Sequence, residues 1–291
     1  MDTLFKHFIL TRFNVIDSET YRASSYDYVN SDEYLSQRFQ LFETYCLPSI
    51  INQSNKNFTW LLLFNDQLPE KWRKKLNEFQ KICLNIEVCF MREFPKGKQR
   101  DLLNQLIINE LKRLEVKPEY IMTTRFDNDD AFHFSFVDSV QQYFLEQPKE
   151  MLINYANGLQ YVPQYNVLKN IRVINGHFGT LVEKNNGNIR TVASFSHNPL
   201  PTDLPPAESL KIKKRIWLET VHNSNEFNEA WFRPRYFFQD FFLMGFKYKN
   251  LNDFGIKQDI PRFNIYVWKV FFEYLGRKFK KKVIGKLVRK K

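Results

Sequence analysis

Short apolar runs and amphipathic stretches alternate along the first 126 residues of the chain. The apolar runs have the length of buried strands, and the stretches between them place apolar side chains every three or four residues, as helices do. Pro48 falls inside the first predicted helix and is expected to kink or end it near Leu47. The pattern predicts strands at residues 7–14, 58–64, 86–91 and 120–126, and helices at residues 35–50, 69–81 and 99–114. This alternation is typical of an α/β fold with a largely parallel sheet.

The residues after 130 predict antiparallel additions to that sheet, where a second binding site could form. Asn185-Asn-Gly-Asn188 is typical of a hairpin turn, so residues 178–183 are expected to pair with residues 189–193. The remaining pattern predicts a helix from Ser135 to Pro148, strands at 151–156, 170–175 and 216–225, and a proline-containing loop at 198–206.

One stretch runs from a buried strand directly into a cluster of acid: Tyr120-Ile-Met-Thr-Thr-Arg-Phe-Asp-Asn-Asp-Asp130. Strand alternation places Arg125 and Asp127 on the same side, and Asp129 joins them if the chain stays extended. Carboxylates this close repel one another, so a divalent cation is a natural partner, and oxygen ligands suit Mg²⁺ or Mn²⁺. The alternative is structural, because Asp and Asn are also common in turns and helix caps.

Polar residues also end the other predicted strands. Arg12 and Asn14 end the first strand, and Asn65 and Asp66 end the second. Ligands of parallel sheets bind outside the carboxyl ends of the strands. Each pair alone is more often the start of a solvated loop, but several polar strand ends that converge on one edge indicate a site.

Several function classes are excluded by missing motifs. The 9 glycines form neither a dinucleotide-binding nor a P-loop sequence, and no nucleophile-elbow sequence is present. The 3 cysteines lack the spacing of a zinc site or a disulfide framework, which favours a reducing compartment. Residues 1–10 lack the apolar core of a signal peptide, and no run is long enough to span a membrane. We expect a cytoplasmic protein, or one peripheral to the inner face of the membrane.

The net charge of +11 is concentrated at the carboxyl end. Residues 277–291 contain nine Lys or Arg and no acid, so the rest of the chain carries 34 basic against 32 acidic residues (43 − 9 against 32), or +2. From residue 266 onward, apolar residues recur at helical spacing among basic ones. We expect one folded domain at 1–265 and a basic amphipathic tail at 266–291 that binds an anionic membrane surface. The alternative is a solvated helix that packs on the domain through Trp268 and Phe271.

The acid stretch also carries a family resemblance. Thr123-Thr-Arg-Phe-Asp-Asn-Asp-Asp-Ala131 resembles the core motif of the putative rhamnosyltransferase family, which is similar to the wider GT-A nucleotide-sugar glycosyltransferases. Segments 7–13, 38–50 and 217–222, together with Gln53 and residues 57–60, also fit, so that the resemblance covers roughly residues 5–225. It implies a GT-A-like mixed sheet flanked by helices, and a metal-dependent transfer of a hexosyl group, rhamnose being one candidate, from a nucleotide diphosphate sugar.

The resemblance also implies roles for individual residues. Asp129 is expected to ligate the cation, and Asp127 to hold the cation or the ribose. Because Asp130 follows directly, the motif alone does not fix which two carboxylates form the Asp-x-Asp pair. Arg125 would stabilise the departing diphosphate or orient Asp127. Many GT-A enzymes add a late histidine to the metal, for which His222 is the first candidate and His197 the second.

Further candidates follow from position in the chain. Arg12 and Asp66, at strand ends, are candidates for nucleotide contact, and Lys98 and Arg100, near a helix start, for phosphate contact. An inverting enzyme needs a carboxylate base, and Asp240 and Glu226 are possible choices, although each is more often a surface acid.

Other functions compete with this interpretation. A metal-dependent phosphatase also uses Asp-x-Asp after a strand, but after the first strand of its core, whereas here the motif follows the fourth predicted strand. A basic nucleic-acid-binding protein would carry its charge on the fold, and here the charge is in the tail. A degenerate fold that serves as an interaction module is disfavoured by the intact acid cluster. The sequence therefore predicts a glycosyltransferase acting on a cell-surface glycan or a lipid-linked precursor.

Overall fold

The structure is a computed structural model that describes residues 2–17, 26–94, 97–173, 178–194, 207–210, 215–222 and 249–261, and single residues between 266 and 276. Its strands are β1 (Asp2–Arg12), β2 (Ile16–Asp17), β3 (Thr59–Asn65), β4 (Ile86–Met91), β5 (Glu93–Phe94), β6 (Lys117–Arg125), β7 (Ala131–Phe132), β8 (Met151–Tyr155), β9 (Asn157–Val162), β10 (Val167–Arg172), β11 (Thr180–Lys184), β12 (Ala207–Leu210), β13 (Trp217–Thr220), β14 (Asn250–Leu251) and β15 (Ile256–Asp259). Its helical segments are α1 (Tyr26–Val29), α2 (Asp32–Leu41), the π-helical η1 (Phe42–Cys46), α3 (Leu47–Ile51), α4 (Glu70–Ile82), α5 (Gln99–Arg113), α6 (Phe136–Glu146), and the short η2 (Pro163–Tyr165), η3 (Val192–Ser194) and η5 (Asn252–Phe254).

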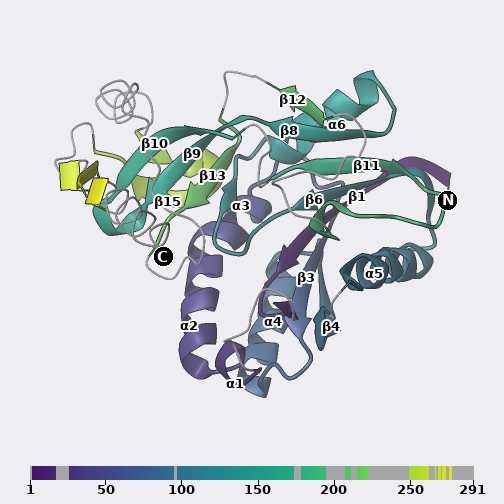
Figure 1. Ribbon diagram of the computed structural model, residues 1–291, viewed down its shortest axis with the longest axis horizontal. Coiled ribbons are helices and arrows are strands. Elements are labelled where there is room, and N and C mark those ends of the chain that lie inside the picture. The colour runs from purple at the N-terminus through teal and green to yellow at the C-terminus, as the bar shows by residue number, and fades with distance from the viewer. Residues whose placement is uncertain are drawn as a thin grey trace, which may run out of the picture.

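A seven-stranded mixed sheet forms the centre of the molecule, in the order β12-β8-β11-β6-β1-β3-β4 (Figure 1). β6, β1, β3 and β4 are parallel neighbours, while β11 runs antiparallel to both β6 and β8. Because four parallel strands share one direction, their carboxyl ends meet at one edge of the sheet. The predicted fold class, a mixed GT-A-like sheet flanked by helices, is confirmed.

Helices cover both faces of the sheet, which explains the unbroken apolar run of β3. Trp60, Leu62 and Phe64 belong to the cluster that includes side chains of α2, α4 and α6, while Leu61 and Leu63 face α5 on the other side. All residues of β3 are buried. A strand buried on both faces has no solvated side, and its sequence therefore lacks polar alternation.

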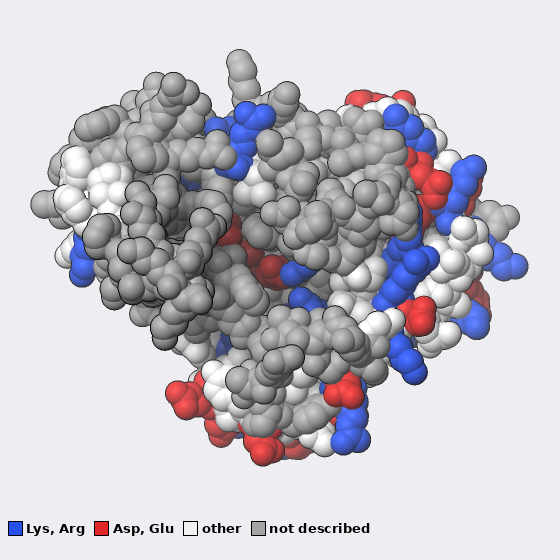
Figure 2. Space-filling model, in the orientation of Figure 1, with Lys and Arg blue, Asp and Glu red and all other residues white. Residues whose placement is uncertain are grey.

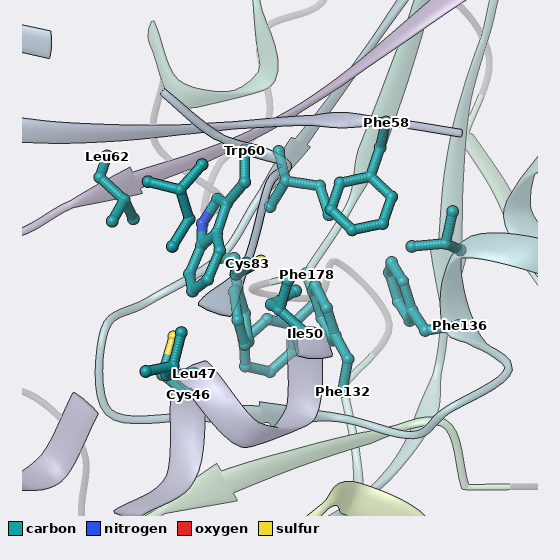
Figure 3. Close-up of a cluster of buried hydrophobic side chains, with 14 of the residues drawn as sticks. Cys46, Leu47, Ile50, Phe58, Trp60, Leu62, Cys83, Phe132, Phe136 and Phe178 are labelled. Carbon is teal, nitrogen blue, oxygen red and sulfur yellow. The ribbon is translucent and has the colours of Figure 1, made fainter. Parts of the chain in front are cut away.

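A second, four-stranded sheet has the order β10-β9-β13-β7. The core that joins it to the main sheet is largely aromatic: Figure 3 shows Phe132, from β7, beside Phe136, in the cluster that also contains Trp60 and Phe178. The rings of Phe132 and Phe136 stack with their centroids 3.7 Å apart. The predicted strand at 216–225 is found as the shorter β13, and β9, which was not predicted, lies beside it.

Pro48 was expected to kink or end the first long helix near Leu47; the helix does not end there but passes through an irregular, π-helical turn and continues to Ile51. The turn before the proline is π-helical, and the Leu47 N–H bonds to the Phe42 oxygen five residues earlier. A proline ring normally clashes with the carbonyl four residues before it. The wider turn accommodates that ring, so the helix passes the proline.

The predicted hairpin around residues 185–188 is wrong. Residues 180–184 form β11, but the segment after the turn forms the short helix η3 instead of a strand. β11 already pairs with β6 on one edge and with β8 on the other, so no edge is left for a third partner. The buried Glu183 carboxylate instead accepts the backbone N–H groups of Arg190 and Thr191, and this folds the segment back.

The described residues of the tail, all between 266 and 276, are helical. The Tyr266 ring stacks on Tyr165 of η2 at 5.8 Å, and the Lys269 ammonium lies 4.9 Å from the same ring. Trp268, Phe272 and Leu275 are exposed. The basic segment 277–291 and the predicted loop at 198–206 lie outside the described residues. Within the part of the chain that is described, no helix is long and apolar enough to cross a membrane.

Candidate functional site at the carboxyl end of the sheet

The acid motif occupies a turn that begins two residues after β6. The motif is held between two aromatic residues, Phe126 before it and Phe132 after it, whose rings stack 4.0 Å apart. The chain turns at Asn128 and Asp129, so the strand alternation does not extend to Asp129. The side chain of Asn128 donates to the backbone oxygens of Arg12 and Phe13, at 3.1 and 3.2 Å. The turn is therefore fixed to the end of β1.

Polar strand ends meet at this edge, as the sequence predicted. The Oδ1 atom of Asn14 accepts the backbone N–H of Asn65 at 2.9 Å, which ties the end of β1 to the end of β3. Figure 2 shows acidic and basic side chains side by side in a hollow near the middle of this face, in the part of the view where β1 ends in Figure 1.

Asp129 is the residue on which distant segments converge. Its Oδ2 atom accepts a hydrogen bond from Nη1 of Arg38, in α2, at 3.0 Å. The same oxygen lies 2.9 Å from Nε2 of His222, two residues after β13. Asp129 is 5% exposed, so both contacts are shielded from solvent. The structure brings together the predicted pair of Asp129 and His222 and adds Arg38, which the sequence reasoning did not select, although Arg38 begins one of the segments that carry the family resemblance.

The three carboxylates of the motif differ in environment. The side chain of Asp127 is 36% exposed and lies 3.5 Å from Nε of Arg125, so these two residues share a side as predicted. Asp130 is 1% exposed, and its Oδ1 atom accepts the backbone N–H of Thr220 at 2.7 Å. Burial, with the nearby charges of Asp129, Asp127 and Glu219, raises the pKa of Asp130 well above its usual range. Asp130 thus anchors β13, and with it the approach to His222, to the acid motif.

The residues present fit a divalent cation through Asp129 and His222. Adjacent ligands of an octahedral Mg²⁺ at about 2.1 Å are about 3.0 Å apart, and the Oδ2 and Nε2 atoms have nearly that separation. Asn128 adds a buried acceptor, since its Oδ1 atom has no hydrogen-bond partner among the described residues. No group of three or more His, Cys, Asp and Glu side chains in the described part of the chain is arranged to hold a metal ion. A carboxylate such as Asp129 together with substrate phosphates is a ligand set that Mg²⁺ takes in proteins.

The other predicted site residues lie at the ends of other strands and helices. Arg12 ends β1, and its carbonyl contacts Asn128. Asp66 is exposed just after β3, and its N–H bonds to the Met91 oxygen. Lys98 and Arg100 are exposed at the start of α5, where Arg100 donates to Oδ1 of Asn188 at 3.4 Å. His197, Glu226 and Asp240 lie outside the described residues.

The structure thus has a mixed sheet with four parallel strands, and an acidic turn beside a histidine at their carboxyl ends. The family model described as "Putative rhamnosyl transferase" matches residues 5–233. The chain therefore belongs to this family, and the resemblance stated from the motifs is confirmed.

Solved structures with a similar fold include those of TarS from S. aureus. The chain is 14% identical to TarS 1–349 in complex with UDP-GlcNAc, with a TM-score of 0.40. The match covers 94% of this chain and 73% of the TarS chain. For a second structure of TarS 1–349 the identity is 12% and the TM-score is 0.37. That match covers 74% of this chain and 60% of the TarS chain. For a longer TarS structure the identity is 12% and the TM-score is 0.36. That match covers 74% of this chain and 37% of the TarS chain. A search of curated proteins finds no match.

Proposed function

We propose that the protein transfers a sugar from a nucleotide diphosphate sugar to a cell-surface glycan or a lipid-linked acceptor, with Mn²⁺ or Mg²⁺ held by Asp129 and His222. The observation that carries this proposal is the 2.9 Å contact between these two side chains at the carboxyl end of β6, in a member of a glycosyltransferase family. Rhamnose is the sugar that the family description suggests.

The residues of the site would have different roles in such a transfer. A bound divalent cation would stabilise the charge of the departing diphosphate. Asp129 and His222 would hold it, while the more exposed Asp127 would reach the cation or the ribose. Arg125 would orient Asp127 or balance phosphate charge. We assign nucleotide contacts to the exposed edge of the sheet: Arg12, Asp66, Lys98 and Arg100.

The proposal includes an anionic membrane surface as a partner. The exposed side chains of Trp268, Phe272 and Leu275 are spaced by four and three residues, which puts them on one face of the helix. Tryptophan favours the membrane interface, and the nine basic residues that follow in 277–291 complement acidic lipids. The full chain should therefore cosediment with phosphatidylserine vesicles, less so at high salt. A variant with Trp268→Glu and Phe272→Glu that still cosediments fully would refute this part.

Calorimetric titration of UDP and dTDP, with and without Mn²⁺, tests the nucleotide site. We expect one of these nucleotides to bind in a metal-dependent manner, and Asp129→Asn to weaken binding at least tenfold because a neutral amide ligates a divalent cation poorly. Asp32→Asn is the matched control, since Asp32 is an exposed carboxylate paired with Lys71, away from the acid motif. If neither nucleotide binds, GDP and CMP are to be titrated next. Failure of all four, or equal binding by the Asp129→Asn variant, would contradict the proposed site.

A further inference from the structure

Arg38 and Asp129 form an ion pair that links α2 to the centre of the acid motif. The side chain of Arg38 is 20% exposed and that of Asp129 is 8% exposed, with 3.0 Å between Nη1 and Oδ2. A pair this well shielded interacts more strongly than a surface pair, because water and salt screen it less. The charge of Asp129 is therefore already compensated by a residue of the protein itself.

Arg38 is charged and only partly satisfied. Burial alone lowers the pKa of its guanidinium, but the attraction of Asp129 and Tyr34 outweighs burial and raises that pKa. The guanidinium carbon also lies 5.9 Å from the centre of the Tyr34 ring. The Nε–H group is buried and has no hydrogen-bond partner among the described residues. A buried unpaired donor is unfavourable, so an additional acceptor at Arg38 would be stabilising.

The same carboxylate oxygen is the one that we assign to the cation. With Arg38 in place, a cation at Asp129 would lie beside a second positive charge, and this repulsion would weaken metal binding. A nucleoside diphosphate changes the balance, because phosphate oxygens match the fork of a guanidinium and can accept its hydrogen bonds.

We propose, on the basis of the proposed function, that Arg38 is an internal counter-ion that couples metal binding to nucleotide binding. Without nucleotide, Arg38 neutralises Asp129 and keeps the affinity for metal low. When a diphosphate enters, Arg38 leaves Asp129 and pairs with phosphate, and Asp129 becomes available to the cation. Arg38 is thus a positioning residue that acts through Asp129, and it makes the two ligands bind cooperatively.

The test measures Mn²⁺ affinity by the paramagnetic resonance signal of free Mn²⁺, without nucleotide and with the saturating nucleoside diphosphate that the wild type binds. Arg38→Met should bind Mn²⁺ alone about tenfold more tightly than the wild type, and the enhancement of Mn²⁺ affinity by nucleotide should fall by a similar factor. Arg38→Lys, which keeps the charge, should bind Mn²⁺ alone as weakly as the wild type. Arg113→Met removes a more exposed arginine, paired with Glu110 and Glu87 away from the acid motif, and should change neither value.

The outcomes separate this inference from the proposed function. A folded Arg38→Met variant that binds Mn²⁺ alone as weakly as the wild type, or more weakly, would overturn the counter-ion role even if nucleotide binding is intact. If the wild type binds no nucleoside diphosphate in the presence of metal, the proposed function itself fails. Should Arg38→Met not fold, Arg38→Gln removes the same charge while keeping a polar side chain, and the same prediction applies to it.

Discussion

His7 is buried, neutral and central to the sheet, and it should make the stability of the protein fall at acid pH. It lies in β1 with 0% exposure. Gln141 has both of its amide hydrogens in use, one donated to the Asn57 oxygen at 2.8 Å and one to Nδ1 of His7 at 3.1 Å. Nδ1 is therefore an acceptor, and the His7 proton is on Nε2, which donates to Thr124 at 2.7 Å. A second proton on Nδ1 would point at the Gln141 N–H, so that two donors would oppose each other.

The magnitude follows from the two protonation equilibria. Burial, with a smaller contribution from the Lys6 charge, lowers the pKa of His7 from 6.5 to about 3. The unfolded chain thus binds a proton at a pH where the folded chain does not. The contribution of His7 to stability is complete above pH 6.5 and is lost as the pH falls toward 3. By linkage, the loss is about 2 kcal/mol at pH 5 and about 3 kcal/mol at pH 4. Against a typical stability of about 5–15 kcal/mol, either value is readily measured.

Urea unfolding at pH 8, 6, 5 and 4, compared between the wild type and His7→Gln, isolates this contribution. Other groups also titrate in this range, but their effects are common to both proteins and cancel in the difference. The variant should be less stable at pH 8, because it loses packing, and its stability should fall about 2 kcal/mol less than that of the wild type between pH 8 and pH 5. Equal losses in the two proteins, or an NMR titration in which His7 protonates near pH 6.5, would refute the reasoning.

Two further substitutions test how the second sheet supports the site. Gly158→Ala should lower the thermal midpoint and reduce the free energy of unfolding by roughly 1–3 kcal/mol or more, because a Cβ atom there would be 2.3 Å from the Trp217 ring. A midpoint equal to that of the wild type would show that β9 and β13 pack less closely. Asp130→Ala should reduce the free energy of unfolding by about 1–3 kcal/mol, since the Thr220 N–H would lose its buried acceptor. It should also weaken nucleotide binding. Urea unfolding measures the first effect and calorimetry the second, and unchanged stability would exclude the anchoring role.

The four parallel strands of the main sheet could be predicted from sequence, and the signal is clearest in β3, which is buried on both faces. The run Trp60 to Phe64 allows few other structures, and each of the first helices has a clear apolar stripe. β9 was missed because it contains Gly158 and the buried Gln160. The side chain of Gln160 donates to Glu219 of β13 at 2.6 Å, and Gly158 leaves room for Trp217. Both features depend on a neighbouring strand and leave no periodic signal in the local sequence.

The candidate site could be predicted only in part for a related reason. The sequence presents Asp127, Asp129 and Asp130 as one cluster, and alternation would place Asp127 and Asp129 on the same side. The turn after β6 separates them instead, so that Asp127 faces solvent beside Arg125, while Asp130 accepts a backbone N–H of β13. Asp129 meets two side chains that lie 91 and 93 residues away in the chain. No spacing rule links such distant positions: the family resemblance alone suggested His222, and Arg38 could be identified only once the fold had brought α2 to the same strand end.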